Sequence, residues 1–264
     1  MQFAGKTILI TGASSGIGRA CARRFAQLGS KLVLTARSAD LLDKLAAELA
    51  PVETHAIPAD LTETASIAQL CDQALGRCGK IDILINCAGV GLYAPASKSD
   101  PEKVRYLMAL NLLAPVELIR RLSPTMTAGS AIVNISSIGG KVPLPWLSVY
   151  TASKYALNGY SDALRTEVQS RGIQVLSMCP GFVETSFREN VLQGRIPALV
   201  AAQKRFLITA EQCADEVVEG LRAGKRTVVT PRIGWLLVLV ARLFPAIVYG
   251  RMGRMRRTED GGAG

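Results

Sequence analysis

The residues best suited to chemistry are a hydroxyl, a phenol and an ammonium that lie close together in the sequence: Ser137, Tyr150 and Lys154. Tyr150 and Lys154 are four positions apart in a run of helix-forming residues, so a helix places both side chains on one face. An ordinary tyrosine has a pKa of about 10 and transfers protons poorly near neutrality. A positive charge about 4 Å away, at an effective dielectric near 20, favours the phenolate by on the order of 4 kcal/mol. The three residues therefore indicate proton transfer, although a lone Tyr-x-x-x-Lys pattern is more often an ordinary helix surface.

A glycine-rich turn near the start of the chain is the first supporting pattern. It follows a short β-branched run at residues 6–11 and precedes a helical period, which is the order strand, turn, helix. Such a turn lets a pyrophosphate approach bare backbone at a helix N-terminus, where unpaired N–H groups and the helix dipole favour anions. Its spacing, G-x-x-x-G-x-G, differs from the commoner G-x-G-x-x-G. The predicted phosphate-binding residues are Gly12, Ser14, Ser15, Gly16, Ile17 and Gly18.

The end of the second predicted strand, at residues 31–36, indicates which nucleotide fits. An acidic residue at this point would accept a hydrogen bond from a free ribose 2′-hydroxyl. The sequence has Ala36, Arg37 and Ser38 there instead. A cationic and hydroxylated pocket suits a 2′-phosphate, so the expected cofactor is NADP(H). The alternative is an arginine that is merely solvated after a strand.

The rest of the chain alternates between buried strands and helices. After the first two strands, one strand is predicted to end at residue 60 and others to span residues 80–86, 130–136, 173–179 and 226–230, with helices at residues 39–50, 62–77 and 101–122 and around Tyr150. This alternation predicts an α/β protein with a parallel sheet and helices on both faces. Because no repeat or linker is visible, one domain is expected at residues 1–230, followed by a C-terminal extension at residues 231–264.

Composition argues against several other classes of protein. The net charge is +10, but basic residues are scattered among acidic ones until the C-terminal extension, so nucleic acid is not an expected partner. Six cysteines show no C-x-x-C pair and no histidine at metal-ligand spacing, so neither a metal site nor a disulfide framework is expected. The first residues lack the apolar segment of a secretory signal, and the expected location is therefore cytoplasmic.

From residue 6 to about residue 230, these motifs and their order resemble the short-chain dehydrogenase/reductase family. The matching pieces are Thr11-Gly12-x-x-x-Gly16-Ile17-Gly18, Asp60, Asn86-x-Ala88-Gly89, Asn111, Ser137, Tyr150-x-x-x-Lys154 and Pro180-Gly181-x-x-x-Thr185. The resemblance implies a Rossmann fold whose seven-stranded, doubly wound parallel sheet has the order 3-2-1-4-5-6-7, assembled as a homodimer or homotetramer. One departure is Cys87, where many members have a second asparagine.

The resemblance also implies a role for each matching residue. Tyr150 would donate the proton, Ser137 would hydrogen-bond the substrate oxygen, and Lys154 would hold the nicotinamide ribose and lower the pKa of Tyr150. Asn111 would anchor a water in the proton relay. The other predicted cofactor contacts are Asp60 at the adenine, Leu61, Asn86, Ala88 and Gly89 on the adenosine side, Pro180, Gly181, Val183, and Thr185 at the carboxamide.

The expected activity is NADPH-dependent reduction of a ketone to a secondary alcohol, in which the 4-pro-S hydride passes to the carbonyl carbon. The mouth of the site is predicted to be apolar, which suits an acyl or steroid substrate better than a sugar. Its expected lining is Leu92, Tyr93, Val142, Pro143, Leu144, Trp146, Phe182 and Phe187. The run Leu34-Thr35-Ala36-Arg37-Ser38, together with the long apolar and basic tail, looks like members of the family that reduce lipid ketones, such as 3-ketosphinganine reductases and corticosteroid dehydrogenases. Two alternatives stay open: a 3-oxoacyl thioester reductase served by an acidic carrier protein, and a non-catalytic NADPH-binding regulator.

The C-terminal extension carries six arginines and no acidic residue between residues 232 and 257. Arg242 interrupts its apolar run and Pro245 would kink it, so a membrane-spanning helix is not expected. Two shorter apolar segments flanked by arginines fit a peripheral pair of helices at the inner face of a membrane. The alternative is a tail that folds back over the substrate mouth or onto a partner subunit.

Overall fold

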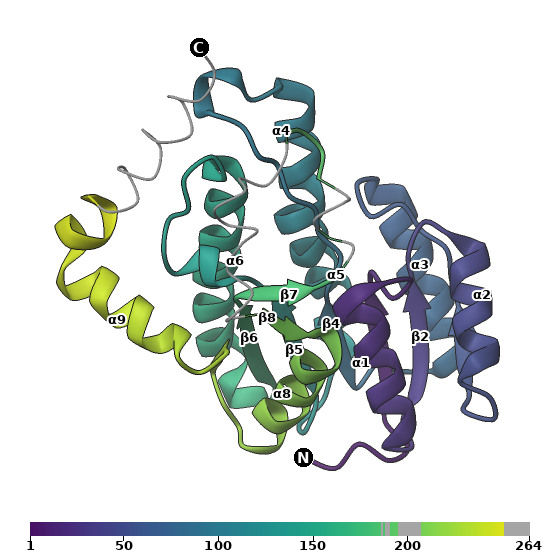
Figure 1. The fold of residues 1–264 in the computed structure, drawn as a ribbon. Helices are drawn as coiled ribbons and strands as arrows, with labels where there is room; N and C mark the ends of the chain where they lie inside the picture. Colours follow the sequence, from purple (N-terminus) through teal and green to yellow (C-terminus); the bar gives the residue numbers. More distant parts are fainter. Residues whose placement is uncertain (186, 188–190, 195–206, 251–264) are drawn as a thin grey trace.

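The central sheet has seven parallel strands in the order β3-β2-β1-β4-β5-β6-β9. Figure 1 labels β2, β4, β5 and β6 of this sheet. This computed structural model describes residues 1–185, 187, 191–194 and 207–250. Because β9 is the seventh strand of the sheet along the chain, the predicted order 3-2-1-4-5-6-7 is confirmed. The strands are β1 (Thr7–Thr11), β2 (Lys31–Thr35), β3 (Thr54–Ala56), β4 (Ile83–Asn86), β5 (Ala131–Ile135), β6 (Gln174–Pro180) and β9 (Thr227–Thr230).

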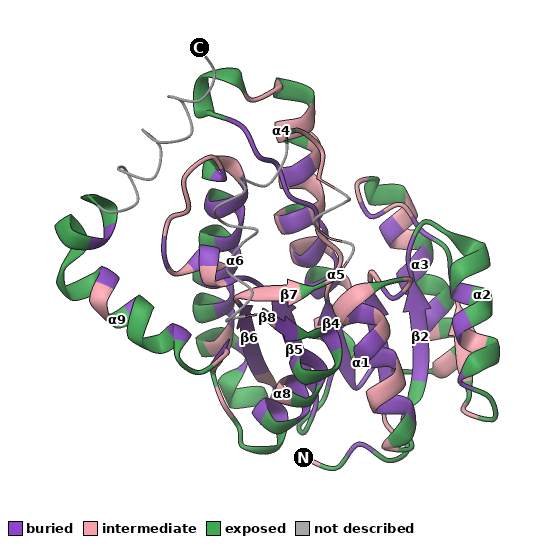
Figure 2. Ribbon diagram, viewed as in Figure 1, coloured by how far each residue is buried: buried purple, intermediate pink, exposed green. Residues whose placement is uncertain are grey.

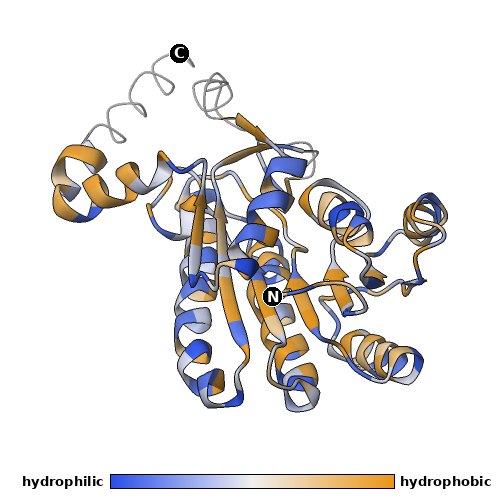
Figure 3. Ribbon diagram, turned by 90° about the horizontal axis from the view of Figure 1, so that it is seen from below, coloured by the Kyte–Doolittle hydropathy of each residue, from blue (hydrophilic) through white to orange (hydrophobic). Residues whose placement is uncertain are grey.

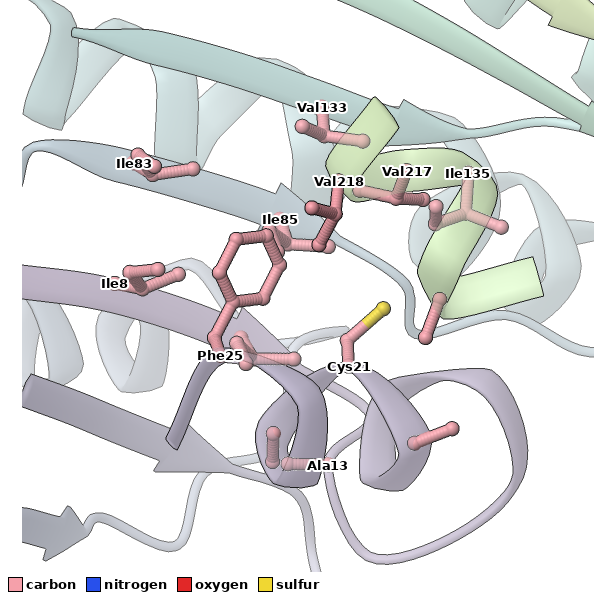
Figure 4. Close-up of a cluster of buried hydrophobic side chains, with 14 of the residues drawn as sticks. Ile8, Ala13, Cys21, Phe25, Ile83, Ile85, Val133, Ile135, Val217 and Val218 are labelled. Atoms are coloured by element: carbon pink, nitrogen blue, oxygen red, sulfur yellow. The ribbon is translucent and has the colours of Figure 1, made fainter. Parts of the chain in front are cut away.

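Helices cover both faces of this sheet because its strands carry apolar side chains on both faces. The α-helices are α1 (Gly16–Gln27), α2 (Ala39–Glu48), α3 (Thr64–Cys78), α4 (Pro101–Met108), α5 (Ala114–Leu122), α6 (Ser148–Val168), α8 (Ala210–Arg222) and α9 (Gly234–Leu243). Along β1, Ile8 packs in one core with Phe25 of α1, whereas the next residue, Leu9, packs in a second core with Leu70 of α3. Figure 4 shows the first core, with Phe25 next to Val218 of α8.

The predicted helix at residues 101–122 is interrupted by a π-helical segment. This segment, Ala109–Leu113, lies between α4 and α5 and carries the buried Asn111. The apolar pattern runs on through it, so the sequence pattern did not reveal the break. π-helical turns inside longer helices are often found at functional sites.

Two further differences concern strands. The strand expected to end at residue 60 is assigned only as Thr54–Ala56. The chain still runs beside β2, since Ala59 N–H donates to the carbonyl oxygen of Ala36 at 3.0 Å. A small parallel sheet of β7 (Phe182–Glu184) and β8 (Leu207–Thr209) was not predicted, since each of its strands has only three residues.

The C-terminal extension begins with α9, which lies to one side of the sheet (Figure 1). One stripe of the helix is buried: Val238 and Ala241 pack with Val248 against Val142. The rest of α9 is largely exposed and hydrophobic (Figures 2 and 3). A second helical segment starts at Pro245. Within the described ranges, each helix is too short or too polar to span a membrane.

Candidate active site

The predicted catalytic residues come together at the carboxyl ends of the central strands. Ser137 follows β5 and begins a short 3₁₀ turn, η4 (Ile138–Gly140), by accepting a hydrogen bond from Gly139 N–H at 3.0 Å. Tyr150 and Lys154 lie on the first turns of α6, which packs beside that turn. The Ser137 hydroxyl hydrogen-bonds the phenol of Tyr150. Hydroxyl, phenol and ammonium are therefore neighbours, as the sequence order suggests.

Burial dominates the electrostatics of this cluster. It raises the pKa of Tyr150 to about 12, although the hydrogen bond with Ser137 acts in the opposite direction. Burial also lowers the pKa of Lys154 to about 8. The Lys154 ammonium lies 5.8 Å from the centre of the Tyr150 ring and donates to the carbonyl oxygen of Ile135 at 2.9 Å. Because the pKa of Tyr150 is raised, the lowering expected from Lys154 is not found here, and the phenol stays protonated at neutral pH.

Asn111 is held by three hydrogen bonds in the π-helical segment. Its Oδ1 accepts from Val90 N–H at 2.9 Å, and its Nδ2 donates to the Val90 carbonyl at 2.9 Å and to Ser153 Oγ at 3.3 Å. The side chain thereby fixes the loop after β4 against α6. The implied role of Asn111 in a proton relay stays a prediction.

The glycine turn forms a close-packed cradle at the N-terminus of α1. Gly12 has φ +66°, and a Cβ there would lie 2.9 Å from the Cα of Ala88. A Cβ on Gly18 would collide with the carbonyl oxygen of Gly12. The first turn of α1 has no acidic residue, and Ser15 makes no side-chain cap. The backbone N–H groups at the start of this helix suit the pyrophosphate of a dinucleotide.

Arg37 and Asp60 lie at the other end of this cradle. Arg37 Nη1 donates to the hydroxyl of Tyr106 on α4 at 2.9 Å. Asp60 accepts hydrogen bonds from the backbone and hydroxyl of Thr62 at 2.9 and 2.7 Å. Burial alone would raise the pKa of Asp60, but these bonds and the charge of Arg37 outweigh it and the pKa is lowered. The site thus presents a guanidinium beside an ionised carboxylate.

A single cavity of about 1520 Å³ joins the cradle to the catalytic cluster. This volume exceeds the range of about 300–1,000 Å³ that is usual for small ligands, which leaves room for a dinucleotide and a second molecule. The predicted site residues that line it are Gly12, Ser14, Ser15, Gly16, Ile17, Arg37, Ser38, Asp60, Leu61, Ala88, Gly89, Tyr93, Ser137, Leu144, Trp146, Tyr150, Lys154, Pro180, Gly181, Phe182, Val183, Thr185 and Phe187.

Several predicted residues lie behind the cavity wall. Asn86 Nδ2 donates to Asn134 Oδ1 at 2.8 Å, so this side chain joins β4 to β5 rather than facing the cofactor site. Leu92 and Val142 are each at most 1% exposed and pack in apolar clusters. They do not line the cavity, and their expected contact with substrate stays a prediction. Pro143 also does not line the cavity, and neither Gly18 nor Asn111 reaches it directly.

Other lining residues were missed by the sequence interpretation. Tyr106 on α4 has no local signal, because its role depends on the distance to Arg37. Val191 and Leu192 follow Phe187, whose ring packs 5.8 Å from that of Tyr150. The largest omission is one wall formed by Ile233, Gly234, Leu236, Leu237, Val240, Ile247 and Val248. The apolar run in the extension was the signal, and folding back over the mouth was the alternative that it left open.

The fold and these residues define a class of protein. Residues 6–195 match the family model described as short chain dehydrogenase. The chain belongs to this family and is an NAD(P)-dependent oxidoreductase. It is 33% identical to Dehydrogenase/reductase SDR family member 7B of Bos taurus, over 96% of this chain and 82% of that protein. It is 32% identical to Ketoacyl reductase HetN of Nostoc, over 92% and 87% of the two chains.

Solved structures agree with this assignment. A short-chain dehydrogenase/reductase from Burkholderia phymatum in complex with NAD has a TM-score of 0.85 and 26% identity, covering 95% of this chain and 96% of that one. A short-chain dehydrogenase from Sphingobium yanoikuyae in complex with NADPH has a TM-score of 0.77 and 31% identity, covering 95% of both chains. Relatives of similar fold thus bind either nicotinamide cofactor.

Proposed function

We propose that this protein reduces a ketone on an apolar, lipid-like substrate to a secondary alcohol with NADPH. Bound NADPH supplies the hydride that reaches the carbonyl carbon. The proton for the carbonyl oxygen comes from Tyr150, whose raised pKa keeps the phenol protonated at neutral pH. Ser137, already hydrogen-bonded to that phenol, positions the same oxygen. Lys154, which lines the cavity, holds the nicotinamide ribose.

The choice of NADPH over NADH rests on the end of β2. Arg37 and Ser38 line the cavity where an acidic residue would accept from a 2′-hydroxyl, and both side chains are exposed to it. A hydrogen bond to a charged group is worth about 1.5–3 kcal/mol, or roughly tenfold to a hundredfold in affinity. We therefore expect kcat/KM with NADPH to exceed that with NADH by at least tenfold.

The single observation that carries the proposed substrate class is the apolar part of the cavity beyond Tyr150. Around the hydroxyl and phenol, its walls come from three places: the loop before α6, the segment around Phe187, and α9. They are almost wholly hydrocarbon and aromatic, with polar groups concentrated at Ser137 and Tyr150. In a pocket of this kind, contact with the apolar walls provides most of the affinity for the ligand, and the few polar groups fix its orientation.

A homologous series of linear ketones tests this proposal. Each buried methylene contributes about 0.8 kcal/mol, so kcat/KM should rise about fourfold per added carbon until the apolar walls are covered. NADPH oxidation would be followed at fixed enzyme for each ketone. A flat series, or a preference for polyhydroxy ketones, contradicts an apolar substrate.

Tyr150→Phe is the matched control for the chemistry. Loss of the proton donor should lower kcat by about a hundredfold to ten-thousandfold, while NADPH affinity measured by fluorescence stays within about twofold. Retention of more than a few per cent of kcat would remove Tyr150 as the proton donor. Absence of turnover with every ketone tested, despite tight NADPH binding, would favour the non-catalytic regulator.

A 3-oxoacyl thioester reductase is the second candidate, favoured by two observations. The Nostoc relative is named as a ketoacyl reductase, and the net charge of +10 suits an acidic carrier protein. The same assay with a 3-oxoacyl thioester, free and attached to carrier protein, separates the two. A preference for the carrier-bound thioester that disappears at high salt would select this second function.

A further inference from the structure

Exposed apolar side chains are concentrated on the C-terminal extension. Of twelve large hydrophobic residues that are exposed in the described ranges, nine lie between Ile233 and Tyr249. Six of them are 53–62% exposed and define what is called here the α9 surface: Ile233, Leu236, Leu239, Leu243, Phe244 and Ile247. A contiguous exposed patch of this kind marks an interaction site rather than ordinary surface.

The α9 surface is continuous with the mouth of the cavity. Three residues of this surface also line the cavity: Ile233, Leu236 and Ile247. The mouth therefore opens among exposed apolar side chains. An apolar molecule that enters between these side chains stays in contact with apolar groups as it moves into the cavity.

The charge around the α9 surface favours an anionic occupant. No acidic residue occurs between Glu219 and Glu259, whereas nine lysines and arginines do. Arg242 lies in the last turn of α9, and Arg232, which is 3.8 Å from Glu216, precedes the helix. Four more arginines follow residue 250 in the sequence. Each arginine near an anionic lipid leaflet adds about 1 kcal/mol of attraction.

A second copy of the chain fits this surface less well than a membrane does. Two-fold pairing would bring the arginines of both copies together, with no acidic residue between positions 232 and 257 to balance them. The length of α9 bears on how it could meet a membrane. Its ten residues rise about 15 Å, which is half of the roughly 30 Å of hydrocarbon in a bilayer, so α9 fits the membrane surface and does not span it. Trp235 and Tyr249, 44% and 45% exposed, are the residue types enriched where lipid meets water.

We propose that the α9 surface docks on an anionic lipid membrane, and that the lipid-like substrate enters the cavity directly from that membrane. α9 lies in the headgroup region, with its exposed face towards the acyl chains and Val238 and Ala241 towards the protein. The route of entry rests on the proposed function, because it requires an apolar substrate. Docking itself does not.

Vesicle co-sedimentation of the full chain tests docking without any turnover. We expect binding to vesicles of phosphatidylcholine with phosphatidylserine, at least tenfold weaker binding to phosphatidylcholine alone, and at least tenfold loss between about 0.1 M and 1 M salt. Leu243→Glu, at a position 62% exposed and outside the cavity lining, should weaken binding at least tenfold. The matched control is Leu113→Glu, at a leucine 59% exposed on the π-helical segment, which should bind as the wild type does.

Other results of these experiments would point to a different occupant of the α9 surface. If the full chain does not bind these vesicles, or if Leu243→Glu and Leu113→Glu lose binding equally, docking through the α9 surface is refuted. If Leu243→Glu instead dissociates an oligomer in sedimentation velocity, the surface belongs to a second copy. NADPH binding by both variants confirms that they are folded. Failure of the ketone assay leaves the vesicle result standing, so the two proposals fail separately.

Discussion

The ammonium of Lys154 is buried, which costs free energy because a charged group is better solvated by water. Burial lowers its pKa from 10.5 to about 8, so between these pH values the unfolded chain binds more protons at this group than the folded chain does. Its contribution to stability therefore rises with pH from about 8 to about 10.5, and below pH 8 the buried charge is destabilising. Such a cost is common at functional positions, where stability is given up for chemistry.

Lys154→Met makes this cost measurable. The variant should lose activity. The difference in free energy of unfolding between variant and wild type should favour the variant most at pH 7. This difference should fall by on the order of 3 kcal/mol towards pH 10, because the wild-type lysine loses its charge over that range. Urea denaturation at several pH values measures both curves. Lys98→Met, at an exposed lysine, should run parallel to wild type. Parallel curves for Lys154→Met as well would mean that its pKa is not lowered by folding.

Tyr106 is a residue whose effect should appear only through the cofactor. Its hydroxyl accepts from Arg37 Nη1 at 2.9 Å and orients the guanidinium at the cavity wall. Tyr106→Phe should raise KM for NADPH about threefold to tenfold and leave KM for NADH within about twofold. Tyr155→Phe, at an exposed tyrosine of α6 outside the cavity lining, is the control. A lower KM for NADPH would instead mean that the phenol competes with the 2′-phosphate for Arg37.

At the scale of elements, the π-helical segment Ala109–Leu113 positions the loop after β4. Asn111→Ala would leave both backbone groups of Val90 without their side-chain partners in a buried place. We expect a loss of on the order of 2–4 kcal/mol in the free energy of unfolding, measured by urea denaturation. Leu113→Ala, in the same segment but 59% exposed, should lose less than about 0.5 kcal/mol. Similar losses for the two variants would show that the amide bonds do not hold this loop.

The elements differ in how far the sequence predicts them. The strands follow from short apolar runs such as residues 131–135, buried on both faces, and their order follows from the family. The π-helical segment and the β7–β8 sheet do not follow, because an unbroken apolar pattern and three-residue strands leave no local signal. In the site, Ser137, Tyr150 and Lys154 are visible through their spacing and order. The Arg37–Tyr106 contact joins residues 69 positions apart and needs the fold.

At the scale of the whole molecule, the cavity has two halves built from different parts of the chain. Most of the nucleotide half comes from the first crossovers, from the glycine turn to Gly89, and it is completed by Tyr106, Pro180, Gly181, Val183 and Thr185. The substrate half comes from the loop before α6, the segment around Phe187 and α9. Because α9 contributes lining residues to the substrate half, a change at α9 should alter the use of substrate and leave the binding of cofactor intact.

Truncation after Pro231 tests this division. It removes the α9 wall and uncovers Val142, while the nucleotide half keeps every lining residue from Gly12 to Gly89. The dissociation constant for NADPH should stay within about twofold. The roughly fourfold gain in kcat/KM per methylene should stop at shorter ketones than in the full chain, because the hydrocarbon surface that rewards longer chains is absent.

A subtler variant guards against a truncated chain that unfolds once Val142 is exposed. Leu237→Ser with Val240→Ser makes the cavity side of α9 polar in the full chain and leaves Val238 and Ala241 packed on Val142. It should shorten the chain-length dependence as truncation does, whereas Leu243→Glu, which alters only the outer face, should leave it unchanged for ketones dissolved in water. If truncation weakened NADPH binding as strongly as it weakened ketone use, α9 would be supporting the whole site and not one half of it.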